Sequence, residues 1–250
     1  MHLYEAPTQT PPPPPPTPSI PIVVFDNGVI QVSLRALTLA SCVAITVALL
    51  LMLKGACEYD EPPLFDCNAR IPMISSVICL PTYDRITCLL FMFFSYSVQQ
   101  QNLRANYKKL HGIISQETND FLFWTGIVSV VSLPAITFFD EHILMAIHGV
   151  IAVIIFTSIG LYAYVYTDAT MKNRAKFSPE MQQEIDLAAR VANWLLYSLV
   201  GLALSAAIMG TGYYLTPILE WCTTLLFLNY FGLLSFGNEY YSTLVVPKDQ

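Results

Sequence analysis

Charged side chains are scarce in this sequence, and their scarcity excludes a protein that is surrounded by water. Only 12% of its 250 residues are charged and 54% are hydrophobic, whereas an average soluble domain has about 25% charged residues. These charges are too few to cover a solvated surface, which leaves lipid as the solvent to consider. The 12 basic residues form no block that could follow a phosphate backbone, and the formal net charge is -6. We therefore expect no nucleic-acid partner.

The usual motifs for metal and serine chemistry are also missing. The sequence has no Cys-x-x-Cys pair, no histidine-rich cluster and no Gly-x-Ser-x-Gly motif. The first two are typical of metal sites and the third is typical of serine hydrolases. We therefore expect neither a metal nor another cofactor.

Proline is distributed unevenly along the chain. Nine of the 17 prolines occur in the first 21 residues, six of them consecutively at positions 11–16. A proline run favours extended polyproline II structure and donates no hydrogen bonds to a helix or sheet. We predict a disordered, cytosolic, proline-rich tail over residues 1–31 that acts as a spacer. Recognition of this tail by an SH3, WW or EVH-type partner stays open.

Six apolar segments follow the tail, at residues 32–53, 84–101, 121–139, 143–166, 191–209 and 213–236. Five of them have about 19 to 24 residues, enough for a helix to cross a hydrocarbon core of roughly 30 Å. The second has a shorter apolar part and must continue either through Gln99, Gln100 and Gln101 or through Thr82 and Tyr83, which a helix buried in a bundle allows. The predicted fold is an all-α, polytopic membrane protein. It comprises a six-transmembrane-helix bundle over residues 32–238 and a cytosolic tail over residues 239–250.

Lysine and arginine are distributed unequally between the two ends of these segments. Nine of the 12 fall on one side, among them Arg35 and Lys108, and only Lys54, Arg70 and Arg85 fall on the other. Cytosolic loops of membrane proteins carry the excess of basic residues. We therefore predict that both termini and the second and fourth loops are cytosolic.

Three of the six cysteines lie in the first loop, which this orientation places in the lumen. They are Cys57, Cys67 and Cys79, in a compartment that permits disulfides. A bridge between Cys57 and Cys67 would close a short loop, and it is the predicted pairing. The odd number leaves the two other pairings open.

Ionisable side chains inside the spans need an explanation, because a charge in lipid costs a few kcal/mol. Asp84 and Arg85 begin the second span, His148 lies about a turn and a half into the fourth, and Glu220 lies about two turns into the sixth. The even-numbered spans run in the same direction, so these groups form one polar pocket if the three spans converge. Either Glu220 orients His148 as a general base for acyl transfer, or the two side chains form a structural clamp between helices.

Four short stretches resemble motifs of one protein family. Residues 32–35 resemble its Val-x-Leu-Arg entry to the first span, and residues 72–76 resemble a Pro-Ser-Val-Ser-Ser segment that follows a lumenal cysteine. Residues 218–221 are similar to a Leu-Glu-Tyr or Ser-Glu-Trp start of the last span, and residues 236–239 to an Asp-Phe-Gly-Asn-Lys ending. Over about residues 30–245 the chain resembles the Frag/DRAM/Sfk family of six-span proteins, and most of all its post-GPI-attachment branch.

This resemblance implies a multi-pass protein of the Golgi or ER membrane that takes part in GPI-anchor lipid remodelling, by fatty-acid reacylation of the lyso form of the anchor. Its implied partners are membrane lipids and GPI-anchored proteins. His148 aligns with a family histidine that opens the fourth span, and Arg85 with an arginine near the start of the second. We expect His148 and Glu220 to be the catalytic base and its orienting carboxylate, and Arg85 and Asp84 to bind lipid.

The resemblance leaves the biochemical class of the protein open. The chain is either a lipid acyltransferase or an accessory to one. The alternative is a non-enzymatic relative of the DRAM or Sfk type in the lysosomal or plasma membrane, which regulates autophagy, organises lipids or accompanies another protein.

Overall fold

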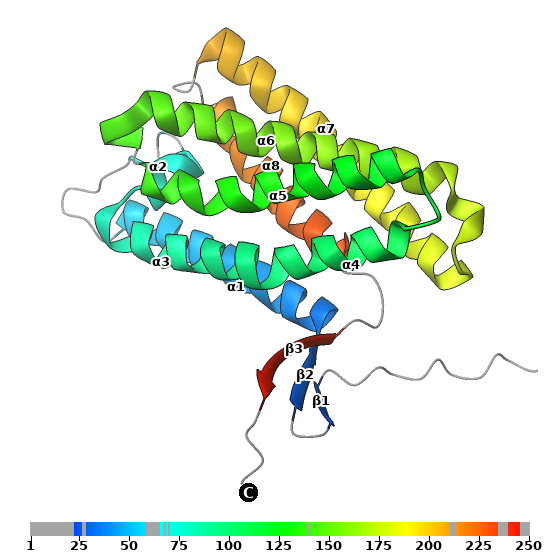
Figure 1. The fold of residues 1–250 in the computed structure, drawn as a ribbon. Coiled ribbons are helices and arrows are strands. Elements are labelled where there is room, and N and C mark those ends of the chain that lie inside the picture. The colour runs from blue at the N-terminus through cyan, green and yellow to red at the C-terminus, as the bar shows by residue number, and fades with distance from the viewer. Residues whose placement is uncertain are drawn as a thin grey trace, which may run out of the picture.

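A computed structural model describes residues 23–26, 29–58, 66–67, 69, 71–139, 141–210, 214–234 and 240–245. From residue 34 to residue 234 the described chain is helical, and its long helices lie alongside one another (Figure 1). The predicted helical class is therefore confirmed for this part of the protein.

Within the described residues, five helices are long and apolar enough to cross a membrane. They are α1 (Leu34–Glu58), α5 (Gln116–Phe138), α6 (Glu141–Lys172), α7 (Pro179–Met209) and α8 (Leu215–Leu234). Their outer faces expose large apolar side chains such as Leu51, Trp194 and Ile208. Soluble proteins avoid an apolar surface of this extent. This is the architecture of a helical, multi-pass membrane protein.

The second predicted span corresponds to a continuous helical rod made of three consecutive elements. These are α3 (Pro81–Met92), the π-helix η1 (Phe93–Gln99) and α4 (Gln100–Leu110), and the backbone is right-handed helical at both junctions. Figure 1 shows α3 and α4 as one rod beside α1.

Buried polar side chains explain why the apolar part of this rod is short. Gln99 and Asn102 are both only 2% exposed. The Asn102 side-chain amide donates to Thr38 Oγ1 of α1 at 2.8 Å and to Gln99 Oε1 at 3.2 Å. Gln99 therefore faces the interior of the bundle, as predicted, and Asn102 does so as well.

The helices form a closed ring around a buried core. Along the ring, α1 contacts α3, α3 contacts α5, α5 contacts α6, α6 contacts α7, α7 contacts α8, and α8 returns to α1. Tyr162, Tyr230 and Phe94 are among the largest fully buried side chains. Long helices that follow one another along the chain, with α3, η1 and α4 taken as one, run in opposite directions. Each helix of the ring lies between the two neighbours that it contacts.

The two ends of the bundle differ in composition. At one end Arg35, at the start of α1, forms an ion pair of 2.7 Å with Glu184 of α7. At the same end, Lys176 Nζ donates to the carbonyl oxygen of Ile113, in the loop between α4 and α5, at 2.9 Å. The opposite end carries the first loop, the α5–α6 turn and the α7–α8 turn.

The first loop contains a disulfide and a short helix. Cys57 and Cys67 are joined, with Cα atoms 5.6 Å apart, which is the pairing that the sequence favoured. Cys79, the third cysteine of this loop, is buried. Helix α2 (Ile74–Ile78) follows in the same loop, and the sequence analysis did not predict it.

The chain ends form a small antiparallel sheet, which corrects part of the predicted tail. Strands β1 (Val23–Asp26), β2 (Val29–Ser33) and β3 (Tyr240–Val245) pair in the order β1-β2-β3, with Ser33 opposite Tyr240. The prediction of disorder through residue 31 is therefore wrong for β1 and β2. These strands lie beyond the last tail proline, and their partner β3 comes from the other end of the chain. Residues 1–22 lie outside the described residues.

The contact between α4 and α5 depends on a glycine and gives a stability prediction. A Cβ atom added at Gly126 would overlap the side chain of Leu103, whereas one added at Gly149 would meet no atom within 4 Å. Overpacking a well-filled interior typically costs about 1–3 kcal/mol. We expect Gly126→Val to lower the stability of the folded protein in detergent by this amount, measured as unfolding in increasing SDS.

Gly149→Val is the matched control, because it makes the same change in helix propensity at an open position. Adding Leu103→Ala to Gly126→Val should restore part of the lost stability. Equal effects of the two valine variants would contradict the proposed α4–α5 contact.

Candidate functional site

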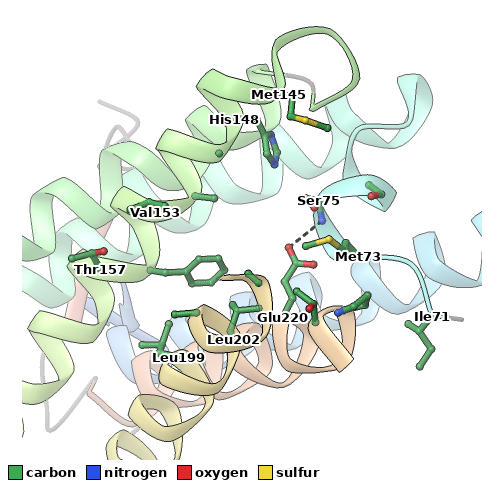
Figure 2. A pocket seen from close by; sticks show the side chains of 18 residues that line it. Ile71, Met73, Ser75, Met145, His148, Val153, Thr157, Leu199, Leu202 and Glu220 are labelled. Carbon is green, nitrogen blue, oxygen red and sulfur yellow. Dashed lines mark hydrogen bonds between the residues drawn. The ribbon is translucent and has the colours of Figure 1, made fainter. Parts of the chain in front are cut away.

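A cavity of about 580 Å³ lies at the end of the bundle that carries the first loop. Its walls come from α6, α7 and α8, and residues 71–76 of the first loop cover one side. Figure 2 shows these side chains around the opening. The volume lies within the range of about 300–1,000 Å³ that is usual for small-molecule sites.

The cavity has a polar end and an apolar end. His148 and Glu220 are 5% and 7% exposed and lie at the polar end near Ser75, while Val153 and Leu199 lie at the apolar end (Figure 2). A site of this kind suits an amphiphilic molecule, since it offers hydrogen-bonding groups at one end and apolar surface at the other.

The cavity also reaches the outer surface of the bundle. Met145 and Val153, which line its α6 wall, are 74% and 65% exposed. Ala203 on the α7 wall is exposed as well. The opening is therefore on the side of the protein, where the apolar helix faces are.

Glu220 holds the start of α2 in place. Its two carboxylate oxygens accept hydrogen bonds from the backbone N–H groups of Ile74, at 2.8 Å, and Ser75, at 3.4 Å. The first N–H groups of a helix have no partner within the helix, and a carboxylate is a strong acceptor for them. Next to Glu220, the Trp221 indole N–H donates to the carbonyl oxygen of Pro72 at 3.0 Å. Glu220 and Trp221 together fix residues 72–75 against α8.

His148 is held by a backbone carbonyl group. Its Nδ1 lies 2.7 Å from the carbonyl oxygen of Phe139, at the end of α5. A carbonyl oxygen can only accept, so Nδ1 carries the hydrogen. In the neutral imidazole, Nε2 then has the lone pair and is the atom that can accept a proton.

The structure brings together two of the four predicted site residues. His148 and Glu220 line the same cavity, from α6 and α8, as expected from their similar depth. Arg85 and Asp84 are not among the lining residues: Arg85 is exposed on α3 and Asp84 is half-buried there. The expectation that the second span joins this pocket is wrong. The reason is the ring order, in which α5 lies between α3 and α6.

Sequence reasoning missed two walls of the cavity. The fifth span, α7, contributes Leu199, Leu202 and Ala203, which are apolar residues without any local signal of function. The first loop contributes Ser75 and Ser76 through α2. The sequence contains one signal for the loop wall, which is that Glu220 and Trp221 are adjacent within an apolar segment. A carboxylate and an indole N–H both need polar partners in an apolar surrounding.

Comparison of the chain with protein-family models, with curated proteins and with solved structures finds no match.

The hydrogen bonds of Glu220 predict a local effect of its removal. Glu220→Ala leaves the buried N–H groups of Ile74 and Ser75 without these acceptors, which costs about 1–3 kcal/mol. We expect lower stability in detergent and faster amide hydrogen exchange over residues 72–79. Glu220→Gln keeps one acceptor oxygen and should have a smaller effect.

Thr223→Val serves as the control for a lost hydrogen bond one turn further along α8. The hydrogen bond that Thr223 Oγ1 donates runs to Ser198 Oγ of α7, at 3.1 Å, and not to residues 72–75. It should reduce overall stability without a selective increase of exchange in residues 72–79. Unchanged exchange there in Glu220→Ala would contradict the role assigned to Glu220.

Proposed function

We propose that this chain is a six-span membrane protein that takes part in remodelling the lipid of GPI anchors, by reacylation of the lyso form in the Golgi or ER membrane. The observation that carries the proposal is the cavity with His148 and Glu220 at its polar end and an opening among the apolar helix faces. A lyso-lipid has this same division, with a hydroxyl and headgroup at one end and a single acyl chain at the other.

The rod formed by α3, η1 and α4 is the second span along the chain, and it brings the proposed number of spans from five to six. It is 30 residues long, about 45 Å at 1.5 Å per residue, and the side-chain amide of its buried Asn102 bonds to Thr38 of α1. With six spans both termini lie on one side, and the excess of basic residues assigns that side to the cytosol. The disulfide of the first loop then faces the lumen, where disulfides form. The cavity accordingly lies near the lumenal surface.

The family resemblance gains support from the spatial placement of its motifs. Residues 72–76 and 218–221 were two separate stretches of the sequence, and the hydrogen bonds of Glu220 and Trp221 join them at the cavity. The stretch at residues 32–35 begins in the last two residues of β2. Strand β2 pairs with β3, which begins directly after the stretch at residues 236–239. Residues 236–239 themselves lie outside the described residues.

In this proposal His148 acts as the general base. Nε2 takes the proton from the free glycerol hydroxyl of the lyso-lipid while that oxygen forms an ester bond to the acyl carbon of an activated donor such as a thioester. The carbon–sulfur bond breaks, and the imidazole returns the proton to the thiolate that leaves. Glu220 is a positioning residue that keeps α2, and with it Ser75 and Ser76, against the cavity.

Mass spectrometry of GPI-anchor lipids tests this function. In cells that lack the protein we expect lyso or unremodelled anchors to accumulate, and re-expression of the wild-type chain to restore the normal lipids. His148→Ala should fail to restore them while the protein is present at the normal level, and His148→Gln should behave in the same way because it provides no base. Val150→Ala, at an exposed position on the same helix that does not line the cavity, is the control.

Unchanged anchor lipids in the cells without the protein would remove the remodelling function. Full rescue by both His148 variants would retain that function but remove the role of the histidine as base.

A second candidate is a non-enzymatic membrane protein of the DRAM or Sfk type. The observation in its favour is that the described bonds of Glu220 and His148 run to backbone atoms of Ile74, Ser75 and Phe139, which is how a structural clamp is built. Location of the protein in lysosomes or at the plasma membrane, with normal anchor lipids in its absence, would favour this candidate.

A further inference from the structure

The apolar end of the cavity is a groove between α6 and α7. On the α6 side it is lined by Gly149, Val153 and Thr157, which follow one another at four-residue spacing and so share one face of the helix. On the α7 side it is lined by Leu199, Leu202, Ala203 and Ala206. We call these residues the α6/α7 groove. Figure 2 places Thr157 and Leu199 at the end of the groove that is far from His148 and Ser75.

The groove ends where α7 closes on α6. One turn beyond Thr157, a Cβ atom added at Gly160 would lie 3.2 Å from Leu199 Cδ1 and 3.9 Å from Leu196 Cδ2. These leucine side chains therefore pack directly on the backbone of Gly160. The absence of a side chain at this position lets the two helices approach closely. Gly160, Leu199 and Leu196 together form the floor of the groove.

The distance from the polar end to this floor matches the length of an acyl chain. Gly160 follows His148 by 12 residues, which corresponds to about 18 Å along α6. One leaflet of a hydrocarbon core is about 15 Å deep. With carbon–carbon bonds of about 1.5 Å, an extended chain advances about 1.25 Å per carbon, so roughly 14 carbons fill the groove.

We propose that the floor formed by Gly160, Leu199 and Leu196 sets the length of the single acyl chain that the cavity selects. The inference rests on the proposed function, which places a lipid in this cavity. A shorter chain leaves part of the groove empty and loses contacts with its walls. A longer chain must bend at the floor and leave through the open side. Selection should therefore peak at chains that reach the floor without bending.

The acyl chain has two sources, the lyso-lipid and the fatty acid that is transferred. Both present the same chemistry to the groove, namely one extended hydrocarbon chain with a polar end. Two probe series separate them: saturated lysophosphatidylinositols and saturated free fatty acids, each with chains from about 10 to about 18 carbons, which bracket one leaflet. The full-length protein is placed in nanodiscs with an equimolar series, and native mass spectrometry gives the occupancy by each chain.

Two variants should move the preferred length in opposite directions. Thr157→Phe puts a ring into the groove three residues before Gly160, which is about 4.5 Å nearer the polar end. The chain length with the highest occupancy should therefore become shorter by roughly three to four carbons. Leu199→Ala removes a side chain from the floor and should shift the peak toward longer chains. Ile154→Phe is the control, because Ile154 is an exposed α6 residue that does not line the cavity.

The outcomes separate this inference from the proposed function. A peak in one series that shifts as stated, with no shift in Ile154→Phe, supports the floor and identifies the source of the chain. Chains retained in the wild type with the same length profile in Thr157→Phe and Leu199→Ala overturn the floor but leave lipid binding intact. Retention of neither series overturns the lipid-binding cavity, and the proposed function falls with it.

Discussion

The site depends on one constraint, which is that polar groups within an apolar bundle must find their partners inside the protein. The Glu220 carboxylate meets this constraint by accepting the N–H groups of Ile74 and Ser75. The same two bonds bring the first loop over the end of the bundle, where α2 becomes a wall of the cavity. These bonds hold the first loop against the space between α6 and α8. The disulfide between Cys57 and Cys67 shortens the same loop from its other side.

The same constraint decides how much of the fold a sequence reveals. Long apolar runs predict helices, and each of the five full-length runs coincides with one long helix. The ends agree within six residues except at α7, which begins at Pro179, 12 residues before the predicted start at residue 191. The rod of α3, η1 and α4 gives a weaker signal because Gln99 and Asn102 turn inward and bond to each other and to Thr38. In this rod the weak hydropathy signal therefore results from polar side chains that are buried inside the bundle, and not from a loop.

Contacts between residues that are far apart in the chain could not be predicted from the sequence. His148 and Glu220 could be placed at one depth because helical rise converts residue number into distance, and depth alone put them in one cavity. Depth does not give the order of helices around a ring, so Arg85 was assigned to a pocket from which α5 separates it. The same holds for β1 and β2, whose partner β3 lies some 200 residues away, and for Gly160, whose role depends on Leu199 of another helix.

The structural and the chemical interpretations of His148 do not exclude each other. The bond from Nδ1 to the carbonyl oxygen of Phe139 ties α6 to the end of α5 and is part of the packing of the bundle. A general base needs such a bond, because it fixes the tautomer and orients the ring while leaving Nε2 as the basic atom. Glu220 differs in this respect, since its described bonds are spent on α2. The proposed division of roles follows from partner type: the carbonyl oxygen of Phe139 accepts from Nδ1, so the imidazole lone pair is on Nε2, whereas the described bonds of the Glu220 carboxylate hold α2. In the proposed mechanism the imidazole is therefore the base, and the carboxylate positions the loop that covers the cavity.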